Sequence, residues 1–222
     1  MNDFGFISAF LVGLAGSLHC VGMCGGIAGA LRTAVPAGNQ PLPYIVSYNL
    51  GRIISYAIAG AITGLLGQIA RASVSHGLMV FQLISAAMLI AMGLYLAQWW
   101  RGLAKLESLG NGLWQRIRPL SKRFIPFKSP LWALPYGIIW GWLPCGLVYS
   151  TLTWALVSGS SWHGAAVMAS FGLGTLPALI AVSIGAGWLI KVLQEPKAKS
   201  LVAILLIIYG VFLIYRTLNG NN

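Results

Sequence analysis

Soft-metal ligands and redox-active thiols gather in a short segment of the first apolar run of the chain. Cys20 and Cys24 are four residues apart, and His19 and Met23 repeat this spacing directly beside them. Residues four apart share one face of a helix, and thiolate, thioether and imidazole groups all suit copper. Ionisable groups inside an apolar segment indicate a functional site by default. This segment is therefore the candidate chemical centre of the protein.

The elements that must position these groups are six apolar segments. A helix of about 20 residues crosses the hydrocarbon core of a bilayer, and each segment is long enough. Lipid offers the backbone no hydrogen bonds, and the runs lack the alternation of strands, so we expect helices. The segments are Phe6–Leu31, Tyr44–Ile69, Leu78–Trp100, Leu131–Val157, Ala165–Leu189 and Ser200–Leu218.

The composition predicts an all-α integral membrane protein, with the lipid bilayer as its surroundings. Charged residues make up 8% of the 222 residues and the mean hydropathy is +0.80, whereas soluble domains are about 25% charged. Three cysteines cannot form a disulfide scaffold. The N-terminus lacks the basic region of a cleavable signal peptide, so we expect the first segment to be retained as a span.

Basic residues predict the orientation of the spans. Eleven Lys and Arg residues lie in the connections after the first, third and fifth segments, whereas the opposite side carries Arg71 and Arg216. The positive-inside rule then places both termini outside. The net charge of +11 thus reports topology, and we expect no nucleic-acid partner. We divide the chain into a first three-helix repeat at 1–100, a basic cytoplasmic linker at 101–130 and a second three-helix repeat at 131–222.

A weak internal repeat relates the two halves of the chain. Three helices per half is an odd number, so the halves would have opposite topology, as in transporters built from inverted repeats with a site near the midplane. Shared use of glycine in membrane helices is the alternative explanation. The matching pairs are Ser47–Gly51 with Ser170–Gly174 at an offset of 123 residues, Gly16 with Gly137 and Cys24 with Cys145 at an offset of 121, and Gly93 with Gly210.

The repeat brings the third cysteine to the same place. Cys145 becomes the partner of Cys24, so three thiols would meet at one site. Glycine and proline are expected where membrane helices unwind or pack closely around a cavity, although ordinary packing is the other explanation. The candidate hinge residues of this kind are Gly22, Gly25, Gly26, Pro144, Gly146 and Pro177.

Three motifs together resemble a known bacterial family: Gly13–Gly26 with its His-Cys-x-x-Met-Cys-Gly-Gly signature, Tyr48–Arg52, and Leu143–Gly146. This six-span family is related to the transmembrane region of thiol-disulfide interchange and cytochrome c biogenesis proteins. Members are also labelled sulfite-exporter-like or urease-accessory-like, and some are similar to proteins associated with copper supply for respiratory oxidases. The resemblance covers essentially the whole chain. It implies a multi-pass protein of the bacterial inner membrane with two inverted halves, and hence periplasmic termini.

The first functional hypothesis is an intramembrane Cu(I) site formed by Cys20, Cys24 and Cys145, with Met23 or His19 as an auxiliary ligand. Helical residues four apart have Cβ atoms about 5–6 Å apart, while a disulfide needs about 3.5–4.5 Å. Cys20 and Cys24 are thus better spaced to share an ion than to bond each other, which favours copper handling for respiratory oxidase or cytochrome biogenesis. A periplasmic metal chaperone would be the partner.

The second hypothesis is a thiol-disulfide oxidoreductase that passes two electrons across the membrane. Cys24 and Cys145 would exchange disulfides with cytoplasmic thioredoxin on one side and a periplasmic redox protein on the other, while Cys20 would be a spare or resolving thiol. In the redox relatives of the family each half carries one proline-flanked cysteine. This chain differs by having Cys20 and by having glycines around Cys24. Export of a small anion and a structural role in assembly are further alternatives.

The remaining polar residues exclude some mechanisms and add accessory candidates. The three acidic residues lie outside the predicted spans, so no intramembrane carboxylate offers a site for coupling transport to protons or sodium. The sequence has no phosphate-binding loop, so we expect no nucleotide cofactor. Arg52 is a candidate for binding an anion within the bundle, unless its side chain extends to the cytoplasmic surface. His76 and His163 lie at the outer ends of the third and fifth segments, where they either pass a metal ion to the site or serve as interfacial residues.

Overall fold

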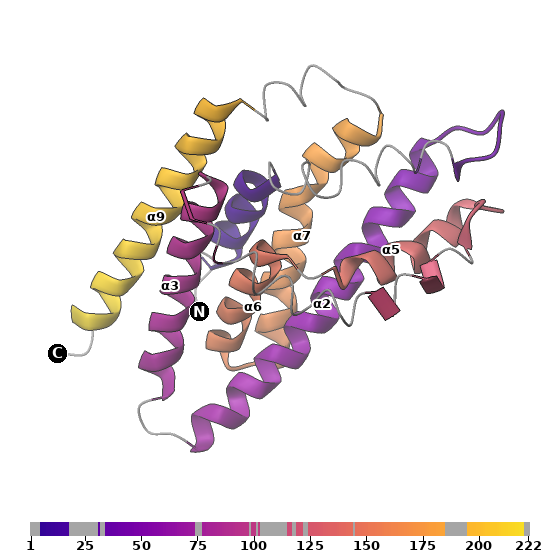
Figure 1. Ribbon diagram of the computed structural model, residues 1–222. Coiled ribbons are helices and arrows are strands. Elements are labelled where there is room, and N and C mark those ends of the chain that lie inside the picture. Colours follow the sequence, from indigo (N-terminus) through magenta and orange to yellow (C-terminus); the bar gives the residue numbers. More distant parts are fainter. Residues whose placement is uncertain are drawn as a thin grey trace.

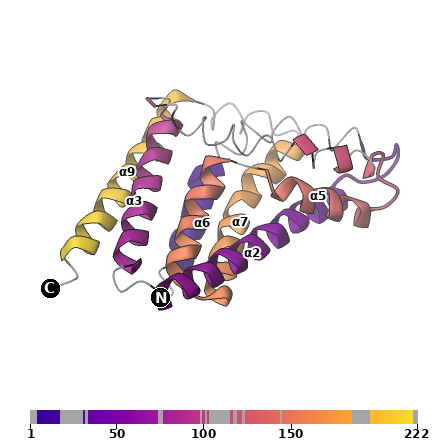
Figure 2. The same cartoon turned by 60° about the horizontal axis from the view of Figure 1, so that its bottom comes forward.

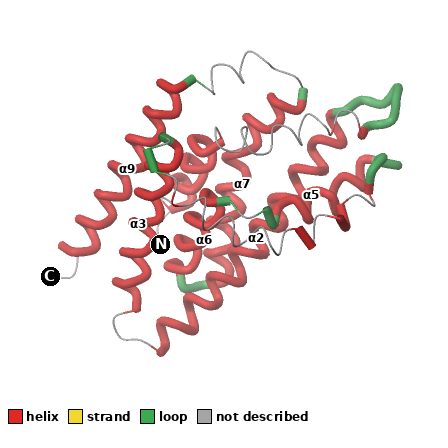
Figure 3. Tube along the Cα trace, in the orientation of Figure 1, coloured by secondary structure: helices red, strands yellow, loops and turns green. Residues whose placement is uncertain are grey.

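The computed structural model describes residues 5–17, 31, 34–73, 77–97, 99–100, 102, 115–116, 119–121, 124–143, 145–184 and 195–219. All regular elements in these residues are helices, and no strand occurs among them (Figures 1 and 3). A first helix, Gly5–Ser17, is followed by α2 (Leu42–Ser73), α3 (Gly77–Leu96), the short 3-10 helix η2 (Pro130–Trp132), α5 (Ala133–Gly141), α6 (Gly146–Ser158), α7 (Ser161–Ser183) and α9 (Pro196–Asn219).

Four predicted segments coincide with single helices: the second, third, fifth and sixth correspond to α2, α3, α7 and α9. In the part of the chain that the structure describes, two helical stretches are long and apolar enough by themselves to cross a bilayer, namely Leu42–Ala70 of α2 and the whole of α7. The first helix covers the beginning of the first segment. The fourth segment is divided between α5 and α6.

The long helix α2 runs obliquely through the right part of Figure 1, and α3 and α9 lie at the opposite edge of the molecule (Figures 1 and 2). It packs against α7, α5 and α6, while α3 pairs with α9 and also contacts α6. The contacts between α2 and α7 run in opposite directions along the two helices, because Gly60 packs on Gly164 and Gly64 packs on Ser160. The helices α2 and α7 are therefore antiparallel.

The outer face of α9 is apolar and exposed. Its side chains Leu201, Leu205, Ile208 and Phe212 are all more than half exposed. An apolar stripe of this kind suits contact with lipid rather than with water.

Glycines bring the backbones of α2 and α5 into close contact. A Cβ atom built on Gly51 would contact the carbonyl oxygen of Leu134 and lie 2.9 Å from the amide nitrogen of Ile138. A Cβ atom on Gly137 would contact the carbonyl oxygen of Tyr48 and lie 2.8 Å from its carbonyl carbon. Small residues permit this approach, and close packing of this kind drives helix association in membranes.

The first helix and α7 make a contact of the same form. A Cβ atom on Gly174 would contact the carbonyl oxygen of Phe10 and lie 2.9 Å from the amide nitrogen of Leu14. A Cβ atom on Gly13 would contact the carbonyl oxygen of Phe171 and lie 3.1 Å from its carbonyl carbon. Each residue of this contact matches one of the α2–α5 contact, at an offset of 123 residues between α2 and α7 and of 124 between the first helix and α5.

The pairing of α3 with α9 repeats the pattern at the edge of the bundle. A Cβ atom on Gly93 of α3 would lie 2.7 Å from Cγ1 of Ile207, and one on Gly210 of α9 would lie 2.6 Å from Cγ1 of Ile90. Gly93 and Gly210 are 117 residues apart, and so are Ile90 and Ile207.

The end of the predicted linker packs on the bundle. Phe127 is 1% exposed and belongs to a buried aromatic cluster with Tyr44, Tyr48 and Tyr136. Its ring stacks on Tyr44 at 6.0 Å and meets the edge of Tyr136 at 5.5 Å, and its backbone N–H donates to the carbonyl of Ala34 at 3.2 Å. The chain thus enters η2 and α5 from an anchored segment.

Candidate functional site

The predicted fourth segment, Leu131–Val157, is interrupted next to its cysteine. The N–H groups of Trp142 and Leu143 donate to carbonyls three residues earlier, both at 3.2 Å, so the end of α5 is wound tightly. Pro144 has no N–H and disfavours the helical conformation in the residue before it. Here α5 ends at Gly141 and α6 begins at Gly146, so the expectation of a single helix through this segment is corrected to two helices.

Cys145 occupies the N-cap position of α6. Its backbone is extended, with φ −133° and ψ 149°, and its carbonyl accepts the N–H of Tyr149 at 3.1 Å. The side chain is 7% exposed. The first N–H groups of a helix have no partner within that helix and form the positive end of its dipole. The break therefore places Cys145 beside the first N–H groups of α6, and its side chain forms no capping hydrogen bond to them.

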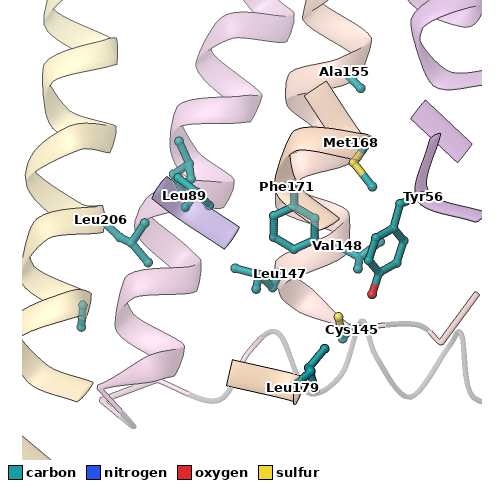
Figure 4. Packing of buried hydrophobic residues seen from close by; sticks show 12 residues of the cluster. Tyr56, Leu89, Cys145, Leu147, Val148, Ala155, Met168, Phe171, Leu179 and Leu206 are labelled. Atoms are coloured by element: carbon teal, nitrogen blue, oxygen red, sulfur yellow. The ribbon is translucent and has the colours of Figure 1, made fainter. Parts of the chain in front are cut away.

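The thiol lies in a buried cluster to which α2, α6 and α7 contribute (Figure 4). Tyr56, Val148, Phe171 and Leu179 belong to this cluster with Cys145. The rings of Tyr56 and Phe171 are 5.7 Å apart. Figure 4 shows the hydroxyl of Tyr56 pointing toward the end of α6 where Cys145 lies. The cluster is apolar apart from this hydroxyl and the thiol.

Arg52 is buried in the same region of α2. The residue is 3% exposed, and its Nη2 atom donates a hydrogen bond to the hydroxyl of Tyr56 at 2.7 Å. Its guanidinium carbon lies 5.5 Å from the ring centroid of Tyr56 and 5.9 Å from that of Tyr48, within the range of cation–π attraction. The side chain of Arg52 is therefore turned into the bundle.

The turn of α2 that holds Arg52 docks on the last turn of α5. A Cβ atom on Gly141 would lie 3.2 Å from Cα of Arg52 and 2.6 Å from Cβ of Ser55. The hydroxyl of Ser55 donates to the carbonyl of Ile138 at 2.7 Å. Because Gly141 is the last residue of α5, the arginine is fixed beside the same helix break that holds Cys145.

The first cysteine segment lies outside the described residues. This holds for the predicted ligands and hinges His19, Cys20, Gly22, Met23, Cys24, Gly25 and Gly26, and also for His76 and Pro144. Gly146 is the first residue of α6. In the part of the chain that the structure describes, no three His, Cys, Asp or Glu side chains come together.

Pro177 and His163 both lie on α7. The helix continues through Pro177 to Ser183, so the break that we expected at this proline is absent. One buried hydroxyl near it, that of Thr175, donates to the carbonyl of Gly172 at 2.8 Å, and such side-chain bonds help membrane helices to tolerate proline. The ring of His163 stacks on Phe6 at 6.2 Å.

The role of the tyrosines that flank Arg52 was not predicted from the sequence. Tyr48 and Tyr56 precede and follow the arginine by four residues, so all three lie on one face of α2. Both tyrosines are buried, at 1% and 4% exposure. This spacing is visible in the sequence and could have indicated an aromatic cage around the cation.

Apolar helices that hold a buried cation and a buried thiol beside a helix break define an integral membrane protein with an intramembrane polar site. The chain belongs to the family described as the cytochrome c biogenesis protein transmembrane region, which it matches over residues 8–212. No curated protein and no solved structure gives a significant match. The family match confirms the resemblance that the three sequence motifs suggested.

Proposed function

We propose that the protein is a transmembrane thiol-disulfide carrier of cytochrome c biogenesis, which passes reducing equivalents from the cytoplasm to the periplasm. Cys24 and Cys145 are its working pair. The observation that carries this proposal is the position of Cys145, a buried N-cap residue in a break between two helices. The thiolate is the nucleophile of disulfide exchange, and the positive end of a helix dipole favours a thiolate beside it. The family of the chain favours the same chemistry.

The exchange conserves atoms and electrons. A thiolate of a cytoplasmic dithiol, such as reduced thioredoxin, attacks the Cys24–Cys145 disulfide; one S–S bond breaks and a mixed disulfide forms. The second donor thiol resolves the mixed disulfide, so the donor becomes oxidised and both cysteines of the carrier are reduced. A periplasmic disulfide then takes the two electrons by the reverse steps.

The carrier works as two inverted three-helix repeats, at 1–100 and 131–222, joined by a cytoplasmic linker at 101–130. The matching glycine contacts support this architecture, because Gly51 and Gly174 meet their neighbours at equivalent atoms. These contacts pair Gly137 with Gly13 rather than with Gly16. Their offset of 124 matches Cys145 with Val21, so the choice of Cys24 as the partner rests on the cysteine motif and not on this alignment. The basic connections support periplasmic termini in a bacterial inner membrane. Rocking of one repeat against the other would expose the cysteine pair to each side in turn.

Cu(I) handling is the second candidate function. The observation that favours it is the spacing of His19, Cys20, Met23 and Cys24, which places soft ligands on neighbouring faces of one segment. Cys145 would supply a further sulfur, and its N-cap position suits a thiolate ligand as well as a nucleophile. A periplasmic metal chaperone would deliver or receive the ion.

Cys20 separates the two candidates, because the copper site needs its sulfur and the dithiol carrier does not. We would reconstitute the full chain and its Cys20→Ser, Cys24→Ser and Cys145→Ser variants in nanodiscs under anaerobic conditions. A carrier predicts that reduced thioredoxin reduces a Cys24–Cys145 disulfide in wild type and in Cys20→Ser. It also predicts that transfer is lost in Cys24→Ser and in Cys145→Ser, because neither variant can form the disulfide that the thioredoxin thiolate attacks.

The same samples test the copper alternative. A copper site predicts about one copper per chain, bound by reduced thiols and lost in Cys20→Ser as well as in Cys145→Ser. Met23→Leu would then weaken copper retention but leave thiol exchange unchanged. A wild-type protein that holds copper and forms no disulfide would reject the carrier proposal.

A further inference from the structure

Among the described residues, α2 places a cation beside the break between α5 and α6, and the equivalent position of α7 carries none. By the matching contacts, Arg52 of α2 corresponds to Thr175 of α7, which lies 123 residues later. Thr175 is also buried, at 2% exposure, but its hydroxyl donates to the carbonyl of Gly172 in its own helix. Tyr56 corresponds to Leu179, which carries no polar group. The surroundings of Cys145 therefore hold a charge and a hydroxyl that the equivalent positions of α7 lack.

The hydroxyl of Tyr56 links the charge of Arg52 to the thiol of Cys145. The hydroxyl oxygen of Tyr56 accepts the N–H of Arg52 at 2.7 Å, so the hydroxyl hydrogen points away from the guanidinium. Tyr56 and Cys145 belong to one buried cluster, and the hydroxyl is turned toward the cysteine (Figure 4). A hydroxyl that accepts from a cation is polarised and becomes a stronger donor.

We propose that Tyr56 donates a hydrogen bond to the thiolate of Cys145 when the disulfide is reduced, and that Arg52 acts as a positioning residue that polarises and orients Tyr56. This inference rests on the proposed carrier function. Stabilising the thiolate favours the dithiol over the disulfide, which makes the couple more oxidising.

A Cys145 thiolate stabilised by Tyr56 also favours one direction of attack on the disulfide. The more stable thiolate is the better leaving group in disulfide exchange. The donor thiolate therefore bonds to the sulfur of Cys24, the Cys24–Cys145 bond breaks, and Cys145 leaves with the electron pair. The donor's second thiol then releases Cys24. The mixed disulfide with the donor accordingly forms on Cys24 and not on Cys145.

The test measures the redox equilibrium of the cysteine pair in the full chain, held in nanodiscs and equilibrated with glutathione buffers of graded potential. Thiols are then trapped by alkylation and counted by mass. Tyr56→Phe should lower the equilibrium constant for reduction about tenfold, which is about 30 mV for a two-electron couple. Arg52→Gln should act in the same direction, with Arg52→Lys in between because it keeps the charge.

Tyr48→Phe is the matched control. It removes the same hydroxyl from the same helix and the same distance along the chain from Arg52, but its ring packs in the other cluster, with Tyr44, Phe127 and Tyr136. An unchanged equilibrium in Tyr48→Phe together with a shift in Tyr56→Phe supports the inference. Equal shifts in both variants, or no shift in Tyr56→Phe, overturn it while leaving the carrier function intact. A wild type without any Cys24–Cys145 couple removes the carrier function itself, and the inference with it.

Discussion

The contact between α2 and α5 and the contact between the first helix and α7 share their backbone geometry and differ in the side chains around it. Gly51 and Gly174 each approach a backbone amide nitrogen of the neighbouring helix at 2.9 Å from a built Cβ atom. At the equivalent positions that follow, α2 carries Arg52, Ser55 and Tyr56, whereas α7 carries Thr175, Ala178 and Leu179.

This difference shows which residues are held by packing and which are open to chemistry. A glycine in a close backbone contact cannot change, because any Cβ atom meets main-chain atoms that have no room to move. The side chains that follow Gly51 lie beside the break at the end of α5, and they differ in kind from the side chains that follow Gly174. The polar set lies in α2, beside the break that holds Cys145.

The largest effect is expected from moving the cation to the other half by Thr175→Arg. Thr175 is 2% exposed, and Leu179 offers no hydroxyl where α2 has Tyr56. A buried charge without partners costs several kcal/mol, so the variant should give almost no monodisperse protein in detergent gel filtration. Arg52→Thr removes one charge-assisted hydrogen bond and should cost only about 1.5–3 kcal/mol.

A second substitution supplies a hydrogen-bond partner for the new arginine in that experiment. Leu179→Tyr restores a hydroxyl four residues after the new arginine, as Tyr56 follows Arg52. The double variant should therefore recover part of the yield. Full stability of Thr175→Arg alone would show that α7 can also hold a cation, which would end the distinction between the two halves.

The next largest loss of stability is expected from replacing Gly137 and Gly13. The loss should be equal in the α2–α5 contact and in the contact between the first helix and α7. A Cβ atom on Gly137 meets the carbonyl of Tyr48, and one on Gly13 meets the carbonyl of Phe171. Overpacking costs about 1–3 kcal/mol, and contacts with backbone place both Gly137→Val and Gly13→Val at the upper end. Thermal unfolding midpoints in detergent should fall by similar amounts.

Ala87→Val, at an exposed position of α3, is the control for added bulk on an apolar helix. Its unfolding midpoint should stay close to that of wild type. A large loss in Gly137→Val with none in Gly13→Val would contradict the equivalence of the two contacts.

Much of the fold could be predicted from the sequence. Long apolar runs specify helices in lipid because no other open structure satisfies the backbone there, and α2, α3, α7 and α9 follow their predicted segments. It was harder to predict which glycine of one half corresponds to which glycine of the other, because several glycines fit each position of a weak repeat. Gly16 was aligned with Gly137, whereas the matching contact belongs to Gly13. A shift of three residues is nearly one helical turn and leaves the apolar pattern unchanged.

Prolines show why the site was less predictable than the fold. Pro144 and Pro177 look alike in the sequence, yet α5 ends shortly before the first and α7 runs through the second. Proline removes one N–H in either case, and neighbouring helices and side chains decide whether the helix survives. The cage of Arg52 was open to prediction from its spacing of four residues, and its closeness to Cys145 required the packing of α2 on α5.

The smallest effect is expected at a serine that crosses between helices. The hydroxyl of Ser55 donates to the carbonyl of Ile138 in α5 at 2.7 Å. The matching carbonyl in the first helix, that of Leu14, accepts the hydroxyl of Ser17 from its own helix at 2.5 Å. Interhelical bonds in membrane proteins contribute about 0.6 kcal/mol on average, up to about 1.7.

Ser55→Ala should therefore lower the free energy of unfolding by about 1 kcal/mol, measured by detergent denaturation of the reconstituted chain. Ser17→Ala should cost less, because its bond ties no second helix to the first. An equal loss of stability in both variants would mean that the hydroxyls of Ser55 and Ser17 contribute equally. The polar side chains of α2 would then add nothing to the packing of α5 beyond what the glycine contact provides.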